Sequence, residues 1–229
     1  MTVADASAKR EGAPMLRLLL MFAMLIAVLP NRTDAHPSFA TRDSAVSIRP
    51  SDVTSEAGPK QRAARIFFSD RRLVTQHGET VQFYTDVLRD RTVLIHFIFT
   101  QCTDSCPTQT ARVAAVQSLL PDAARRRIAF VSISVDPEHD TPQALDEYAT
   151  RFGARPGWTF LTGSKANVDD VLRRVGQLAP SRESHTTLFI LGNVKSGHWI
   201  KVHPDADPKD IAAYLLSLAA ETGADMERR

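Results

Sequence analysis

The stretch that decides the fold is "TVLIHFIFTQCTDSCPTQTARVAAVQSLLP", residues 92–121. It opens with a continuous run of aliphatic and aromatic residues, which is typical of a strand buried on both faces. Helical spacing follows over 107–121, and Pro107 suits the first helical turn. The apolar residues of this helix fall on one side: Val113, Val116, Leu119 and Leu120. The chain's only two cysteines, Cys102 and Cys106, therefore lie between a buried strand and a helix.

Strand and helix patterns alternate along the rest of the chain. Apolar runs predict strands at 128–135 and 158–163, and capped segments predict helices at 141–152 and 164–176. An antiparallel pair is predicted over 186–203 and a closing helix over 207–221. Upstream, residues 65–84 predict short strands joined by a turn at His77-Gly78. This order predicts an α/β fold: a central mixed β-sheet flanked by helices, with an N-terminal hairpin extension. Ligands in such sheets bind beyond the carboxyl ends of the strands, where the cysteines lie.

The N-terminal segment, residues 1–35, has the features of an export signal. Arg17 precedes an apolar run from Leu18 to Leu29, and small residues at the expected positions predict cleavage after Ala35. The run has 12 residues, whereas a membrane-spanning helix needs about 20, so retention as a membrane anchor is the alternative. Met15 is a second candidate start. Bacterial and endoplasmic-reticulum export machinery both read such a signal. We favour an exported protein of a bacterial periplasm, either soluble or tethered to the inner membrane.

Composition divides the remaining chain into a linker and one domain. Residues 36–64 are rich in Ser, Ala, Pro, Arg and Asp without a sustained period, which predicts a flexible linker. Residues 65–225 predict a single globular domain, for which an apolar fraction of 43% in the chain is ordinary. The net charge of +2 gives no reason to expect nucleic-acid binding. The one cationic run, residues 124–127, is interpreted as a helix C-terminus.

The two cysteines suit a shared metal ion better than a structural bridge. Outside the cytosol a thiol pair becomes a disulfide unless it is reduced or bound to metal, and a bridge closing so short a loop adds little stability. Residues i and i+4 of a helix lie about 5–6 Å apart at Cβ, whereas a disulfide prefers about 3.5–4.5 Å. A bridge stays open if Cys102 lies just before the helix. The spacing therefore favours metal without excluding redox chemistry.

Two sulfur ligands leave most metals under-coordinated, so a third ligand is expected among the seven histidines. His96 lies within the predicted buried strand and is interpreted as a core residue. His185 follows a polar loop and directly precedes a strand, so its loop can fold back over the cysteines. The others are expected in turns, at strand ends or in the linker: His36, His77, His139, His198 and His203.

Three stretches together resemble the Sco/SenC family of copper-binding assembly factors for cytochrome c oxidase. They are "FIFTQCTDSCPTQT", "VSISVDPEHDTPQALDEYATRF" with "FLTG", and "ESHTTLFILG", and the similarity covers about residues 68–220. The resemblance implies a thioredoxin-like fold and copper, as Cu(I) or Cu(II), bound by Cys102, Cys106 and His185. Asp136 is similar to the family's acidic residue near the site, and is expected either beside the ligands or in an ordinary N-cap or turn role. Thr103 stands where the family usually has proline.

The resemblance also implies a metallochaperone. Such a protein delivers copper to the binuclear copper site of cytochrome c oxidase or of another cuproprotein, or reduces the thiols of that site with help from a thiol reductant protein. A carrier need not be an enzyme. A thiol–disulfide oxidoreductase of thioredoxin-like fold is the alternative, since a cysteine at a helix start suits that chemistry. A peroxidase with Cys102 as its reactive thiol, a copper sensor or store, and zinc in place of copper also stay open.

Overall fold

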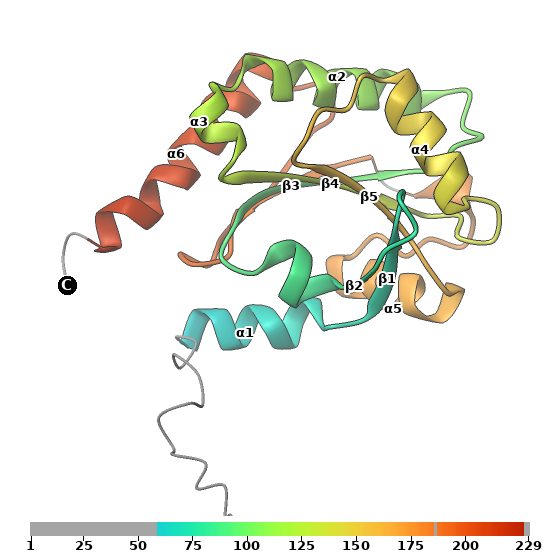
Figure 1. The fold of residues 1–229 in the computed structure, drawn as a ribbon, viewed down its shortest axis with the longest axis horizontal. Coiled ribbons are helices and arrows are strands. Elements are labelled where there is room, and N and C mark those ends of the chain that lie inside the picture. The colour runs from blue at the N-terminus through green and yellow to red at the C-terminus, as the bar shows by residue number, and fades with distance from the viewer. Residues whose placement is uncertain (1–58, 186, 227–229) are drawn as a thin grey trace, which may run out of the picture. The chain divides into compact units, whose positions relative to one another are not determined.

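The computed structural model describes residues 59–185 and 187–226 (Figure 1). The expected export signal, residues 1–35, and most of the expected linker lie outside these ranges. Within the described ranges, no helix combines the length and the apolar character needed to cross a bilayer.

One mixed sheet of seven strands organises the domain, in the order β2-β1-β5-β4-β3-β6-β7. The strands are β1 (Arg72–Thr75), β2 (Thr80–Gln82), β3 (Thr92–Ile98), β4 (Ile128–Ser134), β5 (Trp158–Thr162), β6 (Phe189–Asn193) and β7 (His198–Val202). The central strands β3, β4 and β5 are parallel, and the outer neighbours pair antiparallel. The predicted central mixed sheet is confirmed, and so are the hairpin β1–β2 and the antiparallel pair β6–β7.

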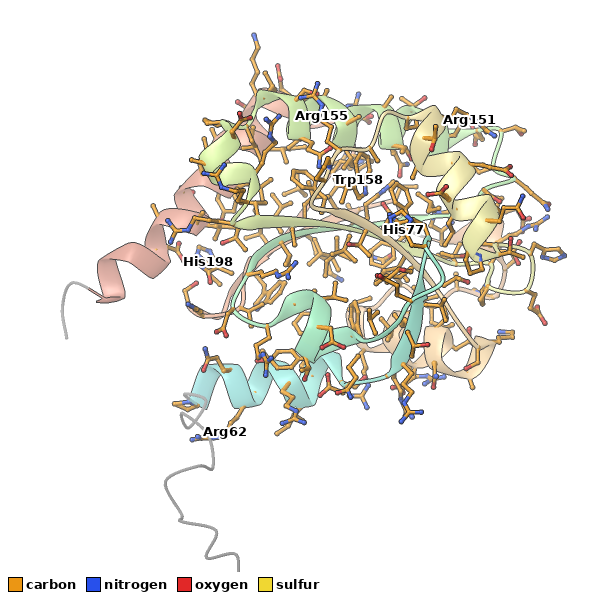
Figure 2. The ribbon with its side chains drawn as sticks, viewed as in Figure 1. Arg62, His77, Arg151, Arg155, Trp158 and His198 are labelled. Atoms are coloured by element: carbon orange, nitrogen blue, oxygen red, sulfur yellow. The ribbon has the colours of Figure 1, made fainter. Side chains whose placement is uncertain are left out.

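The two apolar runs form the middle of this sheet. All seven residues of β3 and of β4 are buried, and the strands pair in register from Thr92 opposite Ile128 to Ile98 opposite Ser134. Side chains fill the space on both faces of the sheet (Figure 2). Because parallel strands share one direction, the chain leaves β3 and β4 at the same edge, and the loops that follow both strands meet there.

Helices cover both faces of the sheet (Figure 1). On one face α2 (Ser105–Leu119), α4 (Pro142–Arg151) and α6 (Pro208–Met226) enclose a core with Leu94, Phe130 and Phe160. On the other face α1 (Pro59–Phe68), the single π-helical turn η2 (Phe83–Leu88) and α5 (Lys165–Val175) enclose a second core. A short helix, α3 (Asp122–Arg125), connects α2 to β4.

The predicted helix ends are confirmed by their caps. The Thr141 and Ser164 hydroxyls accept the N–H groups of Ala144 and Asn167, and Gly176 ends α5 with a φ of 70°. In contrast, α2 starts at Ser105 rather than Pro107, so Cys106 lies inside the helix. Leu119 was expected in the core and is 48% exposed, because Leu120, just past the helix end, takes the buried place.

Helix α1 corrects the prediction for the start of the domain. It occupies residues 59–68, where a linker was expected to 64 and a strand from 65. One side of the helix is buried through Ala64 and Phe68, while Ile66 is 76% exposed. The Tyr84 hydroxyl also donates to the Gln61 carbonyl at 3.0 Å. The Ser- and Ala-rich composition gave no sign of this helix, because its stability comes from packing on the domain.

Candidate metal centre

The cysteines lie at the carboxyl edge of the sheet, where the chain turns from β3 into α2. The Cys102 N–H donates to the Phe99 carbonyl at 3.1 Å, which folds the loop back at the end of β3. Cys106 lies in the first turn of α2, and its N–H points at Cys102 Sγ, 3.4 Å away. Cys102 thus lies just before the helix, in the position that leaves a bridge open. Both are free thiols in this structure.

Hydrogen bonds connect the first turn of α2 to α4. The Thr110 hydroxyl donates to the Cys106 carbonyl at 2.7 Å and lies 2.8 Å from the Tyr148 hydroxyl. Because the Thr110 proton is used on the carbonyl, Tyr148 donates to Thr110. Cys106 is fully buried, and burial, followed by the hydrogen bond with the Cys102 thiol, raises its pKa to about 12. A metal bound here must displace the Cys106 proton.

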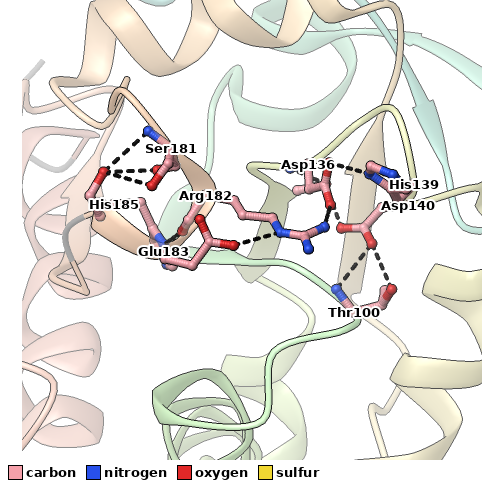
Figure 3. Close-up of polar contacts among 10 residues, drawn as sticks. Thr100, Asp136, His139, Asp140, Ser181, Arg182, Glu183 and His185 are labelled. Carbon is pink, nitrogen blue, oxygen red and sulfur yellow. Dashed lines mark hydrogen bonds and ion pairs between the residues drawn. The ribbon is translucent and has the colours of Figure 1, made fainter.

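Asp140 holds the other side of the cysteine loop. Its buried carboxylate accepts from the Thr100 N–H at 3.0 Å, the Thr100 hydroxyl at 2.6 Å and the Ser134 hydroxyl at 2.6 Å. Burial raises the pKa of Asp140, although these hydrogen bonds oppose the rise. Figure 3 shows the two hydrogen bonds from Thr100 to Asp140. The loop that leads to Cys102 is therefore tied to the end of β4.

His185 lies directly after η3 (Arg182–Ser184), a turn of 3₁₀ helix ahead of β6. Its ring is buried and meets the Phe99 ring edge-on, with centroids 5.9 Å apart. Nδ1 lies within hydrogen-bond distance of the Arg182 carbonyl. A carbonyl only accepts, so Nδ1 carries a proton, and in the neutral ring the lone pair is on Nε2. Among the described residues Nε2 has no partner, which leaves it available as a metal ligand.

We refer to residues 181–185 as the histidine arm. Asp136 and Arg182 connect this arm to the loop that follows β4 (Figure 3). The buried Asp136 carboxylate accepts from the Arg182 guanidinium and from His139 Nδ1 at 2.8 Å. Burial raises the pKa of Asp136, but these two partners outweigh it and the net pKa is lowered. The Arg182 guanidinium also lies 5.3 Å from the centre of the Phe99 ring. Asp136 thus reaches His185 through Arg182.

A polar pocket of about 290 Å³ adjoins His185. Asp136, His139, Arg182 and His185 all line it. That Asp136 acts beside metal ligands stays a prediction. The geometry that supports it is the position of Asp136 next to Arg182 and His185.

His96 lies in the core, as expected, with 1% of its surface exposed. Its Nδ1 is 3.1 Å from the Ser132 hydroxyl. Burial and, second, the charge of His185 lower its pKa to about 3. The histidines of the surface have partners of their own: His77 with Asp146, His139 with Asp136, His198 with Glu221 and His203 with Asp205. His36 lies outside the described residues.

The structure brings the two cysteines together and places His185 against the strand end that carries them. It does not bring the imidazole to the sulfur atoms: the described part of the chain holds no group of three His, Cys, Asp or Glu side chains close enough for one ion. Sequence reasoning missed Asp140 and Arg182. Asp140 lies four positions after Asp136 and Arg182 three positions before His185, and only the folded chain shows what they bind.

The class of protein follows from these features: a thioredoxin-like domain with a dithiol at the start of a helix and a histidine arm beside it. The SCO1/SenC family model matches residues 59–220, and the chain belongs to this family. An SCO2-like protein of Rickettsia prowazekii is 38% identical over 99 residues, which are 43% of this chain and 46% of that protein. The chain thus spans about half the length of the curated relatives of this kind that it matches.

Solved structures of the family share the fold. The structure of Bradyrhizobium japonicum ScoI with copper bound has a TM-score of 0.53 at 26% identity and covers 66% of this chain and 98% of its own. BsSco, a member of the Sco family of cytochrome c oxidase assembly proteins with an identified disulfide switch, has a TM-score of 0.57 at 25% identity, covering 67% and 93%. The predicted thioredoxin-like fold is confirmed.

Proposed function

We propose that this protein is a copper carrier that binds copper through Cys102, Cys106 and His185 and delivers it to the binuclear copper site of cytochrome c oxidase. The observation that carries the proposal is the donor set. Two thiols lie adjacent at the start of α2, and the buried Nε2 of His185 has no partner among the described residues. Thiolates select Cu(I), and an added imidazole also allows Cu(II).

Cargo release follows from the same geometry. The cysteines are fixed by backbone and buried side-chain hydrogen bonds, while His185 stands on a short turn that does not reach them in this structure. A movement of the arm would complete the site, and its return would leave a two-sulfur site open to a partner's ligands. Copper loading requires both thiols reduced, so the state of the dithiol controls it. We place the protein outside the cytosol, in a bacterial periplasm, where its client would be an oxidase subunit or another cuproprotein.

The test is copper titration of the reduced full chain under anaerobic conditions. We expect one Cu(I) per chain, none in Cys102→Ser, and weaker retention against a chelator in His185→Ala. His203→Ala is the matched control, because this histidine is 70% exposed and pairs only with Asp205 among the described residues. Unchanged affinity in His185→Ala would remove His185 from the site, and absence of binding by the wild type would refute the proposal.

A thiol–disulfide oxidoreductase is the second candidate, favoured by one observation. Cys102 lies before the helix with the Cys106 N–H on its sulfur, which is the arrangement that reactive dithiols use. Metal-free protein would then turn over disulfides of partner proteins, such as those of the oxidase copper site. Turnover without copper that is lost in Cys102→Ser and kept in His185→Ala would favour this function over the carrier.

A further inference from the structure

Six cationic side chains gather where the central strands start, at the end of the sheet opposite the cysteines. Arg91, Arg126 and Arg127 line two neighbouring pockets of about 640 Å³ and 260 Å³. Arg125 and Arg155 complete the lining of the larger pocket, and Lys195 that of the smaller one. We refer to these residues as the arginine face: Arg91, Arg125, Arg126, Arg127, Arg155 and Lys195.

The fold assembles this face from four separate segments. Arg91 and Arg127 directly precede Thr92 and Ile128, which are opposite each other at the starts of β3 and β4. Arg155 leads into the parallel strand β5 (Figure 2), and Lys195 lies in the turn after Asn193, the partner of Thr92. The expected helix end at 124–127 is therefore only part of a larger cationic surface, formed where parallel strands start.

Few acidic groups balance the arginine face. Two carboxylates line its pockets, and Asp122 is paired with Arg125, while Asp90 accepts from Gln61 at 2.9 Å. Within the described ranges Arg91, Arg126 and Arg127 form no ion pair, and all three are exposed. The chain as a whole has a net charge of only +2, so this excess is local. Like charges held together repel one another, and an extended anionic surface relieves that repulsion.

The chain reaches the domain at the same edge. Gln61, in the first turn of α1, donates to Asp90, the neighbour of Arg91. The sequence ahead of α1 contains the apolar run 18–29, with residues 30–58 between them. That run, if retained as a membrane anchor, would keep the domain near a bilayer. Guanidinium groups also match phosphate oxygens in a bidentate way, so lipid headgroups suit this surface.

We infer that the arginine face docks on an anionic phospholipid bilayer. The cysteines then lie away from the lipid, because they follow the carboxyl end of β3, whereas the arginine face lies where β3 and β4 start. This surface is independent of copper binding. Each basic residue near an anionic membrane strengthens binding by about fivefold, and the attraction fades as salt shortens its range to a few ångströms.

The test measures protection of arginines in the full chain bound to vesicles. Protein is mixed with phosphatidylcholine vesicles or with vesicles containing phosphatidylglycerol, and phenylglyoxal modification of each arginine is followed by mass spectrometry. With the anionic vesicles present, we expect phenylglyoxal to modify Arg126 and Arg127 more slowly than with phosphatidylcholine, by about fivefold or more. The difference should vanish in molar salt. Arg72 and Arg173 are internal controls, exposed on β1 and α5.

Charge reversal sharpens the result. Arg126→Glu with Arg127→Glu should abolish protection of Arg91 and Arg155, whereas Arg72→Glu with Arg173→Glu, which changes the net charge equally, should keep it. Thermal unfolding checks that both variants fold. Equal modification in the two kinds of vesicle would overturn the inference. Protection by polyglutamate but not by anionic vesicles would assign the face to an acidic protein and overturn it as well. Copper loading leaves these outcomes unchanged, so they are separate from the test of the carrier.

Discussion

The cysteine loop and the histidine arm of the candidate site are built in different ways. The cysteine loop, residues 99–106, is held by backbone hydrogen bonds and by the buried acceptor Asp140. The histidine arm, residues 181–185, is a short turn in which only His185 is buried, and one ion pair from Arg182 connects it to the sheet. In the proposed carrier, rigidly held thiols and a lightly held imidazole would separate the binding of a metal from its release.

The largest effect should come from the rigid half. Cys106→Ser replaces a soft sulfur by a hydroxyl and should lower Cu(I) affinity by more than the roughly 10–100-fold typical of changes next to a metal site. Competition with a Cu(I) chelator under anaerobic conditions measures this. Ser105→Ala, the adjacent helix position, serves as the control and should bind as the wild type does. Full binding by Cys106→Ser would mean that the loop does not supply the grip.

A second change loosens the cysteine loop without touching a sulfur. Asp140→Ala leaves the Thr100 N–H and the Thr100 and Ser134 hydroxyls without their acceptor. A buried donor left unsatisfied costs about 1–3 kcal/mol, so the metal-free variant should lose about 2 kcal/mol of stability in urea unfolding. Glu138→Ala, on an exposed neighbour, is the control. A variant as stable as the wild type would show that Asp140 does not fix the loop.

The sequence predicted the rigid half better than the arm, and the reasons are physical. Strand β3, the caps Thr141 and Ser164 and the helix after the cysteines follow from local patterns, which act within a few residues. Asp140 and Thr100 are 40 positions apart, and Arg182 and Asp136 are 46 apart. Thr100 and Asp140 meet only once β3 and β4 have paired, and Arg182 meets Asp136 only once β6 has also paired with β3.

The arginine face shows the same limit. Its run at 124–127 was visible in the sequence, yet Arg91, Arg155 and Lys195 join it only through the order of the strands. Helix α1 was missed for a related reason, since Ala64 and Phe68 are buried against residues far along the chain. The apolar pattern within these ten residues does not show which distant residues will bury them.

The lightly held arm gives a third prediction. Arg182→Gln removes the ion pair with Asp136 and the cation above Phe99 but keeps the Arg182 carbonyl that orients His185. Loss of a group that positions a ligand typically costs 10–100-fold in metal affinity, and we expect about tenfold here. Chelator competition measures it, and Arg182→Lys should recover part of the loss. Equal affinity in Arg182→Gln would mean that the arm is positioned without the ion pair.

The smallest effect is a pH dependence in the same ion pair. The folded-state pKa of Asp136 lies below its ordinary value, because its partners outweigh burial. The ionised carboxylate therefore stabilises the fold above the unfolded pKa, about 4, and that contribution is lost as the pH falls through the folded pKa. Urea midpoints of metal-free wild type and Asp136→Asn should differ at pH 7 and converge as the pH falls below the unfolded pKa and through the lowered folded pKa. Asp140 has the opposite shift, raised first by burial and in smaller part by the charge of Asp136, so the same pair of urea midpoints is also compared in the Asp140→Asn background. A gap that stays constant with pH would assign the role of Asp136 to packing, and the arm would then be held by shape rather than by charge.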